Sequence, residues 1–329
     1  MNAWVDNFGR TARKLRISVT DRCNLRCVYC MPEHPVWMPK KEILTFEELT
    51  RIASIAARHG VDRLRVTGGE PLLRKDLSVF INMLKGIAGI REIALTTNGL
   101  LLPQQARALY AAGLDRVTVS VDSLHRERVL KLARRDVRDG VLAGIEAARA
   151  AGFEGERLKI NVVVMRGRNE EEVGDITAWA REQNLHLRFI EFMPLEGDKI
   201  WSRSLLVPAE EIISRVKERF PLNVGVRKPG ETAETYSFID GKGSIGVIAS
   251  VTQAFCGDCD RVRITADGGF RTCLFAASGT DLRGPLRSGV SDEGLAEYMK
   301  MAVSRKNRGH LVSDPAFQRP DLAMNAIGG

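Results

Sequence analysis

The sequence is organised around residues 14–30, which read KLRISVTDRCNLRCVYC. Polar and apolar side chains alternate over residues 14–20, and this period of two predicts a β-strand. The strand leads directly into Cys23, Cys27 and Cys30, which have the spacing Cys-x3-Cys-x2-Cys. Three thiolates so close together can surround one inorganic centre. Because a 4Fe–4S cube normally takes four thiolates, a loop with three would leave one iron open for chemistry.

A second group of cysteines lies near the other end of the chain, at Cys256, Cys259 and Cys273, and the two groups account for all 6 cysteines. An odd group cannot pair internally as disulfides, so reduced thiolates in a cytoplasmic protein are the better account. The second spacing favours another cluster with an open iron. The alternatives are zinc sites that lack a ligand, with His34 as the nearest fourth ligand of the first group, or unrelated buried cysteines.

Composition sets the limits of the fold and suggests a kind of partner. The 329 residues suffice for one large domain or for two, and 44% of them are hydrophobic. The sequence contains no run of 18 apolar residues, so no membrane span is expected. The first residues do not resemble a secretory signal. The formal charge of +8 favours an anionic partner. A solvated basic surface is the alternative reading of the same charge.

Strand-like and helix-like segments alternate from residue 14 to residue 220. The first helix has a capping box at Thr45 and Glu48 and ends at Gly60. Further strands are expected at 62–67, 91–97, 115–122, 158–165 and 186–193, and further helices at 77–85, 103–112, 140–151, 170–183 and 209–220. Six such units predict parallel strands with right-handed crossovers. We expect an α/β fold, an incomplete (β/α)6 TIM-like barrel over residues 1–220, with a doubly wound sheet as the alternative.

The character of the chain changes after residue 220. Short strands are expected at 224–227, 235–239 and 244–251, followed by the second cysteine group, a helix at 293–306 and a flexible Gly328-Gly329 tail. No long polar linker marks a separate unit. We therefore expect residues 221–329 to form a mixed, strand-rich region that carries the second cysteine group and closes the open side of the barrel.

Cations occur within strands that otherwise read as apolar. Buried guanidinium groups are costly unless they face a cavity built for an anion, and arginine forks suit phosphate oxygens. The pattern therefore indicates a polyphosphate substrate inside the barrel, with the inward cations Arg16, Arg65, Lys159 and Arg188. Arg261 and Arg263 share one face of a later strand, where a solvated edge is the alternative. Arg188 and Met193 fall on opposite faces of an ideal strand, which fits this scheme imperfectly.

The cysteine loop resembles the signature of the radical S-adenosylmethionine (SAM) enzymes. Within them, the stretch 15–32 is similar to the GTP 3′,8-cyclase family, which acts in molybdenum cofactor biosynthesis. The similarity extends over nearly the whole chain. It includes residues 67–71 (TGGEP), 96–99 (TTNG), 120–124 (SVDSL), 188–193 (RFIEFM), the second cysteine group and the Gly-Gly tail.

The resemblance implies two 4Fe–4S clusters, the first binding SAM and the second holding the guanine base. A 5′-deoxyadenosyl radical would take hydrogen from C3′ of GTP, and the C3′ radical would attack guanine C8. The implied SAM contacts are Tyr29, Gly69, Ser120 and Met193. The implied GTP contacts are Arg16, Arg65, Thr96, Lys159, Arg188, Arg261, Val262 and Arg263. The family also implies that the tail, Gly328 and Gly329, reaches into the active site.

Expected partners are GTP, an electron donor such as flavodoxin or ferredoxin, and the next pathway enzyme, cyclic pyranopterin monophosphate synthase. Neither nucleic acid nor membrane is expected, and the chain would be a monomer or a homodimer. One departure from the family is Glu33-His34-Pro35, where many members have a glycine. The competing functions are a radical SAM enzyme that modifies a peptide and a non-catalytic iron–sulfur or zinc-binding protein.

Overall fold

The computed structural model describes residues 3–310, 312, 317–320 and 322–328. Its strands form one sheet in the order β11-β10-β9-β1-β2-β3-β4-β5-β6-β8-β7. The first six are β1 (Lys14–Ser18), β2 (Arg63–Thr67), β3 (Glu92–Thr97), β4 (Arg116–Ser120), β5 (Leu158–Val164) and β6 (His186–Glu191). The others are β7 (Glu234–Ser237), β8 (Ser244–Ile248), β9 (Arg261–Ile264), β10 (Gly269–Arg271) and β11 (Thr280–Asp281).

The sheet is an open barrel, as the sequence predicts. Strands β1 to β6 are parallel and lie in chain order, which is the order of a (β/α) barrel and not of a doubly wound sheet. Strand β9 adds to the free edge of β1 and strand β8 to that of β6, both in parallel. Both edges of the barrel are thus extended by strands from beyond residue 220, and the sheet does not close. The division of the chain at residue 220 stays a prediction.

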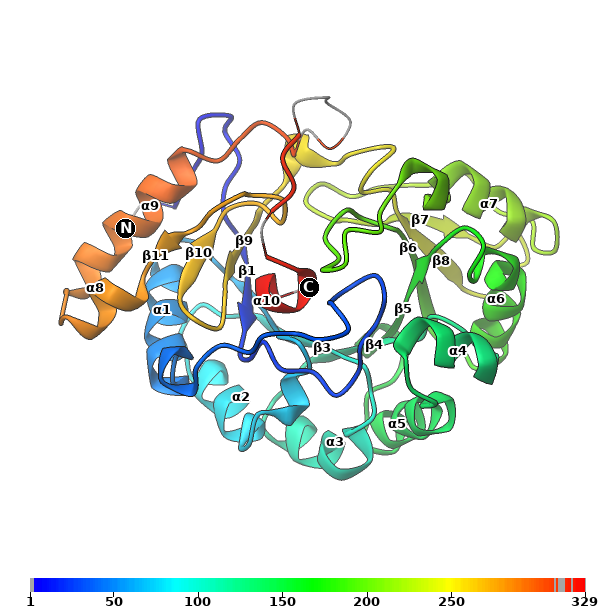
Figure 1. Ribbon diagram of the computed structural model, residues 1–329, viewed down its shortest axis with the longest axis horizontal. Coiled ribbons are helices and arrows are strands. Elements are labelled where there is room, and N and C mark those ends of the chain that lie inside the picture. The colour runs from blue at the N-terminus through cyan, green and yellow to red at the C-terminus, as the bar shows by residue number, and fades with distance from the viewer. Residues whose placement is uncertain (1–2, 311, 313–316, 321, 329) are drawn as a thin grey trace.

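Helices cover the outer side of this curved sheet (Figure 1). Along the barrel they are α1 (Phe46–Arg58), α2 (Leu77–Lys85), α3 (Leu102–Ala111), α4 (Arg126–Ala133), α5 (Arg138–Ala150), α6 (Val173–Glu182) and α7 (Ala209–Lys217). The later helices are α8 (Arg283–Arg287), α9 (Asp292–Ser304) and α10 (Met324–Ile327). Alternate strand residues such as Leu15 and Ile17 are buried in the core. Among the described helices, none is long and apolar enough to cross a bilayer.

The predicted capping box starts helix α1. The Thr45 hydroxyl accepts a hydrogen bond from the Glu48 backbone N–H at 3.2 Å, and the Glu48 carboxylate accepts one from the Thr45 N–H at 2.7 Å. Replacing Thr45 with Ala is expected to lower the free energy of unfolding by about 1 kcal/mol, because one helix-terminal N–H loses its partner. Urea titration measures this change. The Ser54→Ala control, inside the same helix, should change it by less than about 0.5 kcal/mol, and equal effects would contradict the capping role.

The expected strand at 224–227 is wrong, and helix α4 lies between β4 and α5, where no element was expected. Residues 224–227 do not form a strand, because only Val226 makes a bridge, to Thr235. A side chain at Gly225 would collide with the side chains of Glu234 and Tyr236 on β7, so this segment passes close beside that strand.

Residues 324–328 have a defined structure where the sequence predicted a flexible tail, and Gly329 lies outside the described residues. Helix α10 lies inside the curve of the sheet (Figure 1), and Ile327 is fully buried against Leu195, Phe275 and other apolar side chains. The Met324 N–H donates to the Leu195 carbonyl at 2.9 Å, and the Asn325 side chain donates to the Asp21 carbonyl at 3.1 Å. This helix is short and has no side-chain cap, so its sequence gives little sign of it.

Candidate functional site

One cavity of about 400 Å³ lies inside the half-barrel, and both cysteine groups line it. The first group enters from the carboxyl end of β1, and the second comes from the turn before β9 and the end of β10. Residues that are far apart in sequence therefore face one space. The sequence-predicted residues that line this cavity are Arg16, Cys23, Cys27, Tyr29, Cys30, Arg65, Gly69, Thr96, Ser120, Arg188, Met193, Cys256, Cys259, Arg261, Arg263 and Cys273.

The sulfurs of the first cysteine group accept hydrogen bonds from neutral donors. The Cys23 sulfur accepts from the Leu25 N–H at 3.4 Å and from the Asn98 side chain at 3.9 Å. The Cys30 sulfur accepts from the backbone of Asn325, at the start of the inserted α10. Burial raises the pKa of the Cys23 thiol to about 11. The metal-free thiols are therefore protonated at neutral pH, and binding an iron cluster would release their protons.

Tyr29 is fixed by a partner that the sequence reading did not assign. Its hydroxyl donates to Asp122 at 2.6 Å, and the second oxygen of Asp122 accepts from the Val163 N–H at 3.0 Å. Burial raises the pKa of Asp122 to about 6. Asp122 follows β4 and lines the cavity. The sequence could have indicated Asp122, because it lies just after Ser120 at the end of a strand, and the carboxyl ends of barrel strands meet at one mouth of the barrel.

Gly69 allows the loop after β2 to pack against the cysteine loop. A side chain there would collide with the carbonyl oxygens of Asp21 and Arg22, and the Gly69 N–H donates to the Thr20 carbonyl at 2.7 Å. The glycine is therefore required by the contact between two loops, in addition to lining the cavity. The following residue, Glu70, is fully buried.

Glu70 gives the metal-free protein a pH dependence. It accepts from the Leu72 N–H, the Asn98 N–H and the Thr97 hydroxyl at 2.7–3.0 Å. These bonds favour the ionised form, but burial outweighs them and raises the pKa of Glu70 to about 7. A carboxyl whose pKa is higher in the folded than in the unfolded state stabilises the fold at low pH and loses that contribution as pH rises through the folded pKa.

The free energy of unfolding is therefore expected to fall by about 3 kcal/mol through Glu70 as pH rises from about 4 to 8. Denaturant titrations of the metal-free chain across this range measure the fall. Glu70→Gln removes the titration, so its stability, lower from the outset because an amide N–H would face the Asn98 N–H, should vary less with pH. Parallel pH profiles for the two proteins would contradict this assignment.

The second cysteine group faces the cavity beside two cations. Burial acts to raise the pKa of Cys259, but the Arg261 guanidinium, the Lys306 ammonium and their hydrogen bonds outweigh it and lower the pKa below its ordinary value. Cys256 has its pKa raised by burial. Cys259 is thus held closer to the ionised form than Cys256 by its neighbours.

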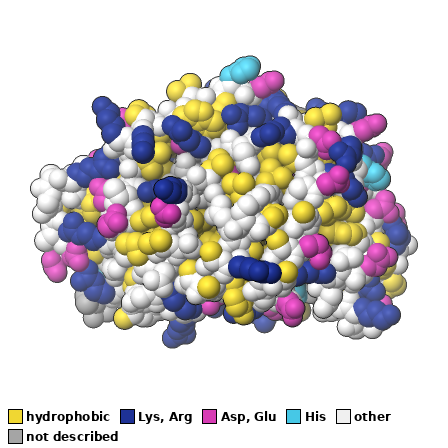
Figure 2. Space-filling model, turned by 90° about the horizontal axis from the view of Figure 1, so that it is seen from below, with side chains coloured by type: hydrophobic (Ala, Val, Ile, Leu, Met, Phe, Trp, Pro, Cys, Tyr) yellow, Lys and Arg dark blue, Asp and Glu magenta, His cyan; other side chains and the backbone are white. Residues whose placement is uncertain are grey.

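Arginine side chains form a row across three adjacent strands. Arg263 on β9 pairs in register with Arg16 on β1, and Arg16 pairs with Arg65 on β2. Register partners on parallel strands project to the same face, and here that face lines the cavity. The prediction that Arg16 points inward is confirmed. On the outer face in Figure 2, by contrast, basic and acidic side chains are interspersed.

These guanidinium groups are poorly compensated. Burial lowers the pKa of Arg65 to about 10 and that of Arg188 to about 9. The pKa of Arg16 is lowered by burial and by the charges of four neighbouring arginines. Within the described residues, Arg16 forms no hydrogen bond or ion pair, and Nη1 of Arg261 is buried without a partner. Buried polar groups normally have partners, so the row is an arrangement that an anion would complete.

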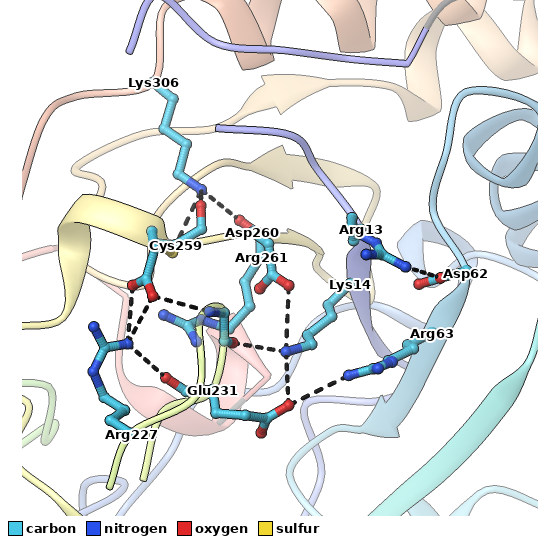
Figure 3. Close-up of polar contacts among 12 residues, drawn as sticks. Arg13, Lys14, Asp62, Arg63, Arg227, Glu231, Cys259, Asp260, Arg261 and Lys306 are labelled. Atoms are coloured by element: carbon cyan, nitrogen blue, oxygen red, sulfur yellow. Dashed lines mark hydrogen bonds and ion pairs between the residues drawn. The ribbon is translucent and has the colours of Figure 1, made fainter. Parts of the chain in front are cut away.

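The basic floor of the cavity is partly closed by Glu231. This carboxylate pairs with Lys14 at 3.2 Å and with Arg63 at 3.3 Å, at the amino-terminal ends of β1 and β2 (Figure 3). Lys14 also contacts Asp260 at 3.3 Å. The sequence reading missed these residues, because Glu231 lies in a loop of no regular structure. These ion pairs give the cations of the floor carboxylate partners. Among the described residues, the arginines of the row have none.

Three residues assigned by resemblance do not line the cavity. Lys159 pairs with Glu156 at 2.6 Å, and the Val262 side chain is buried in the core. Gly328 lies against Ser18, and its carbonyl accepts from Arg263 at 2.9 Å. Gly329 lies outside the described residues.

Arg188 and Met193 both reach the cavity, because β6 ends at Glu191 and the strand alternation stops there. Sequence alternation alone placed them on opposite faces, whereas Met193 belongs to the loop that follows the strand. The departure from the family at residues 33–35 lies at the surface, where Glu33 and His34 are exposed. His34 does not line the cavity, so it does not supply a fourth ligand to the first group in this structure.

The donor sets suit iron–sulfur clusters by their chemistry. Each group offers three free thiols to one cavity, and thiolate sulfur is the usual ligand of such clusters. Neither group has a fourth cysteine, so each cube would keep one open iron toward the cavity. Within the described residues, no three His, Cys, Asp or Glu side chains are arranged to hold a single metal ion.

Comparisons with known proteins agree with this geometry. The family model "Radical SAM superfamily" matches residues 17–180, and "Molybdenum Cofactor Synthesis C" matches residues 185–312. A GTP 3′,8-cyclase of Rhodopirellula baltica is 44% identical over 333 residues, covering 99% of this chain and 92% of the relative. The chain belongs to the GTP 3′,8-cyclase family. A second relative in this family, from Streptomyces coelicolor, is 46% identical, covering 99% of this chain and 96% of its own.

Solved structures show that this cyclase family shares the radical SAM barrel with more distant enzymes. Streptococcus suis SuiB bound to the precursor peptide SuiA has a TM-score of 0.65 at 13% identity, covering 98% of this chain and 77% of that one. The enzyme anSMEcpe with bound AdoMet has a TM-score of 0.63 at 14% identity, covering 90% and 81%. At these identities the likeness concerns the fold alone.

Proposed function

We propose that this chain converts GTP to (8S)-3′,8-cyclo-7,8-dihydroguanosine 5′-triphosphate, the first step of molybdenum cofactor biosynthesis, with SAM and two 4Fe–4S clusters. The observation that carries the proposal is one cavity that joins two three-thiol groups to a row of arginines with no carboxylate partner among the described residues. The relatives bearing this activity in their names match the chain almost from end to end.

Cys23, Cys27 and Cys30, which line the cavity, would hold the first cluster. When bound, the cluster and SAM supply the 5′-deoxyadenosyl radical that removes hydrogen from the substrate. The chain's part is to place SAM. We assign its contacts to Tyr29, Gly69, Ser120 and Met193, which come from four different strand ends of the barrel. The hydrogen bond from Tyr29 to Asp122 holds the aromatic ring in one orientation.

The arginine row would bind the triphosphate of GTP. Arg16 and its register partners present guanidinium groups to the same cavity, and such groups suit phosphate oxygens. The second cluster, on Cys256, Cys259 and Cys273, would hold the guanine base at its open iron. The remaining proposed GTP contacts are Arg65, Thr96, Lys159, Arg188, Arg261, Val262 through its backbone, and Arg263.

Lys159 and Gly328 do not line the cavity, so each would need another way to act on the substrate. Lys159 would have to leave Glu156 to reach the substrate. The tail would act through Gly328, whose carbonyl holds Arg263 and so sets where this guanidinium points. Gly329 is included by resemblance alone.

An anaerobic assay with the reconstituted enzyme tests the proposal. Incubation with GTP, SAM and dithionite is expected to give 5′-deoxyadenosine and a cyclised guanosine product, both detected by chromatography and mass spectrometry. ATP in place of GTP is the matched control and should give no cyclised nucleotide. Formation of 5′-deoxyadenosine with no nucleotide product would contradict GTP cyclisation and favour another radical SAM substrate, such as a peptide. The electron donor, the next pathway enzyme, the oligomeric state and the cytoplasmic location stay predictions.

A further inference from the structure

Lys306 is a buried cation directed at the second cysteine group. It follows helix α9, and 6% of its surface is exposed. Its ammonium donates to the carbonyl oxygens of Cys259 at 2.7 Å and Arg261 at 3.0 Å, and to the Cys259 sulfur at 3.4 Å (Figure 3). A lysine ammonium has three N–H donors. All three are therefore used on the segment that carries this cysteine group.

The surroundings of Lys306 offer it only one source of negative charge. Across the described residues, no carboxylate forms an ion pair with it, and two of its three acceptors are neutral carbonyls. A buried ammonium without a charged partner is costly. The Cys259 sulfur is the one acceptor that becomes anionic when it ligates a metal. The position of Lys306 is thus explained if Cys259 is a thiolate ligand.

Arg10 anchors the same arrangement from the amino-terminal segment. Its guanidinium donates to the Cys256 carbonyl at 2.7 Å and to the carbonyls of Asn307 at 2.7 Å and Arg308 at 3.0 Å. A buried ion pair with Asp6, at 2.6 Å, orients it. Arg10 thus ties the cysteine turn to the segment just after Lys306. These hydrogen bonds hold the segment that follows Lys306 close to the cysteine turn.

The first cysteine group has a cation beside it, Arg26, which donates to the Cys23 carbonyl at 2.8 Å, but no described cation donates to one of its sulfurs. Among the described residues, the hydrogen bonds to the Cys23 sulfur come from the Leu25 backbone and the Asn98 amide, and that to Cys30 comes from the Asn325 backbone. All are neutral donors. A charged donor sits on a sulfur of the second group alone, so the two centres differ electrostatically.

We propose that Lys306 is a positioning residue that stabilises the reduced state of the second cluster through its hydrogen bond to Cys259. Reduction adds one electron to the cluster, and both a positive charge and a hydrogen bond at a ligating sulfur favour the more negative state. Lys306 therefore raises the reduction potential of the second cluster. The inference rests on the proposed second cluster, and no atoms are transferred in the step.

The test uses full-length chains in which Cys23, Cys27 and Cys30 are all replaced by Ala, so that only the second group can hold iron. In this background, Lys306→Met removes the charge and the donor, Lys306→Gln keeps a donor without charge, and Lys306→Arg keeps both. Lys300→Met is the matched control, because Lys300 lies on α9, is exposed and pairs only with Glu297. The readouts are iron content and the midpoint potential. The potential comes from an anaerobic redox titration with dithionite as reductant, monitored by electron paramagnetic resonance.

The background protein is expected to bind about four irons. At the midpoint potential of the background protein, Lys306→Met should have at least about tenfold less reduced than oxidised cluster. This corresponds to a midpoint potential lower by about 59 mV for one electron. Lys306→Gln should shift it less, and Lys306→Arg and Lys300→Met should stay close to the background. If Lys306→Met fails to keep its iron, Lys306→Gln carries the comparison.

Equal midpoint potentials in the Lys306 variants that hold iron and in the background would overturn the role of Lys306 and leave the proposed cyclase intact. A shift of the same size in Lys300→Met would also overturn it, because the effect would then be one of general charge. A background chain that folds, by circular dichroism, but binds no iron would overturn the second cluster itself, and this inference with it.

Discussion

Replacing Arg16 with Met is expected to weaken GTP binding by roughly 10- to 100-fold, the range for losing a charge-assisted hydrogen bond, without lowering the stability of the protein. Arg16 sits between Arg263 and Arg65 in the row that we assign to the triphosphate. It forms no hydrogen bond or ion pair with any described residue, so its removal breaks no contact within the fold. The loss of a desolvated charge beside other arginines should leave the free energy of unfolding unchanged or raised.

Equilibrium binding of GTP and denaturant titration of the same variant measure both parts of this prediction. Arg13→Met is the control, because Arg13 precedes β1, does not line the cavity and pairs with Asp62. It should bind GTP as the unaltered chain does. A variant at Arg16 that binds GTP normally, or one that is clearly destabilised, would show that this side chain supports the fold and not the substrate.

Removing one cysteine from either group is expected to separate the two halves of the reaction. Cys27→Ala should lower 5′-deoxyadenosine formation by more than roughly 100-fold, because the first cluster loses one of only three ligands and with it the site of SAM cleavage. Cys273→Ala should still cleave SAM but form no cyclised product. Iron should fall from about eight to about four per chain in each case.

The measurement is iron content and both products in the same anaerobic preparations. The two variants serve as controls for each other, since each changes one thiol in the same cavity. Loss of SAM cleavage in both would mean that the cysteine groups form one functional unit. Retention of about eight irons in either would contradict the assignment of three cysteines to each cluster.

Much of the barrel could be predicted, because its signals are local. The strand predicted over residues 14–20 and the capping box at Thr45 depend on neighbours within a few positions. The strand is confirmed over Lys14–Ser18, and the capping box is confirmed in full. The inward direction of Arg16 follows from the same alternation. What alternation could not give is the end of each strand: Met193 reaches the cavity only because β6 stops at Glu191.

The supporting contacts of the site could not be predicted from the sequence. Arg10 meets Cys256 across 246 positions of chain, and Asn325 meets Asp21 across 304. Such contacts depend on how the carboxyl-terminal strands join both edges of the sheet, and no local pattern encodes that arrangement. Helix α10 was missed for the same reason, since its stability comes from burial of Ile327 and not from its own sequence.

The most direct test of the account follows one hydrogen atom. GTP carrying deuterium at C3′ is incubated anaerobically with SAM, dithionite and the reconstituted enzyme, and the isolated 5′-deoxyadenosine is examined by mass spectrometry. The account predicts that deuterium appears in 5′-deoxyadenosine together with a cyclised guanosine triphosphate. Formation of 5′-deoxyadenosine without deuterium, at any level of nucleotide product, would contradict it.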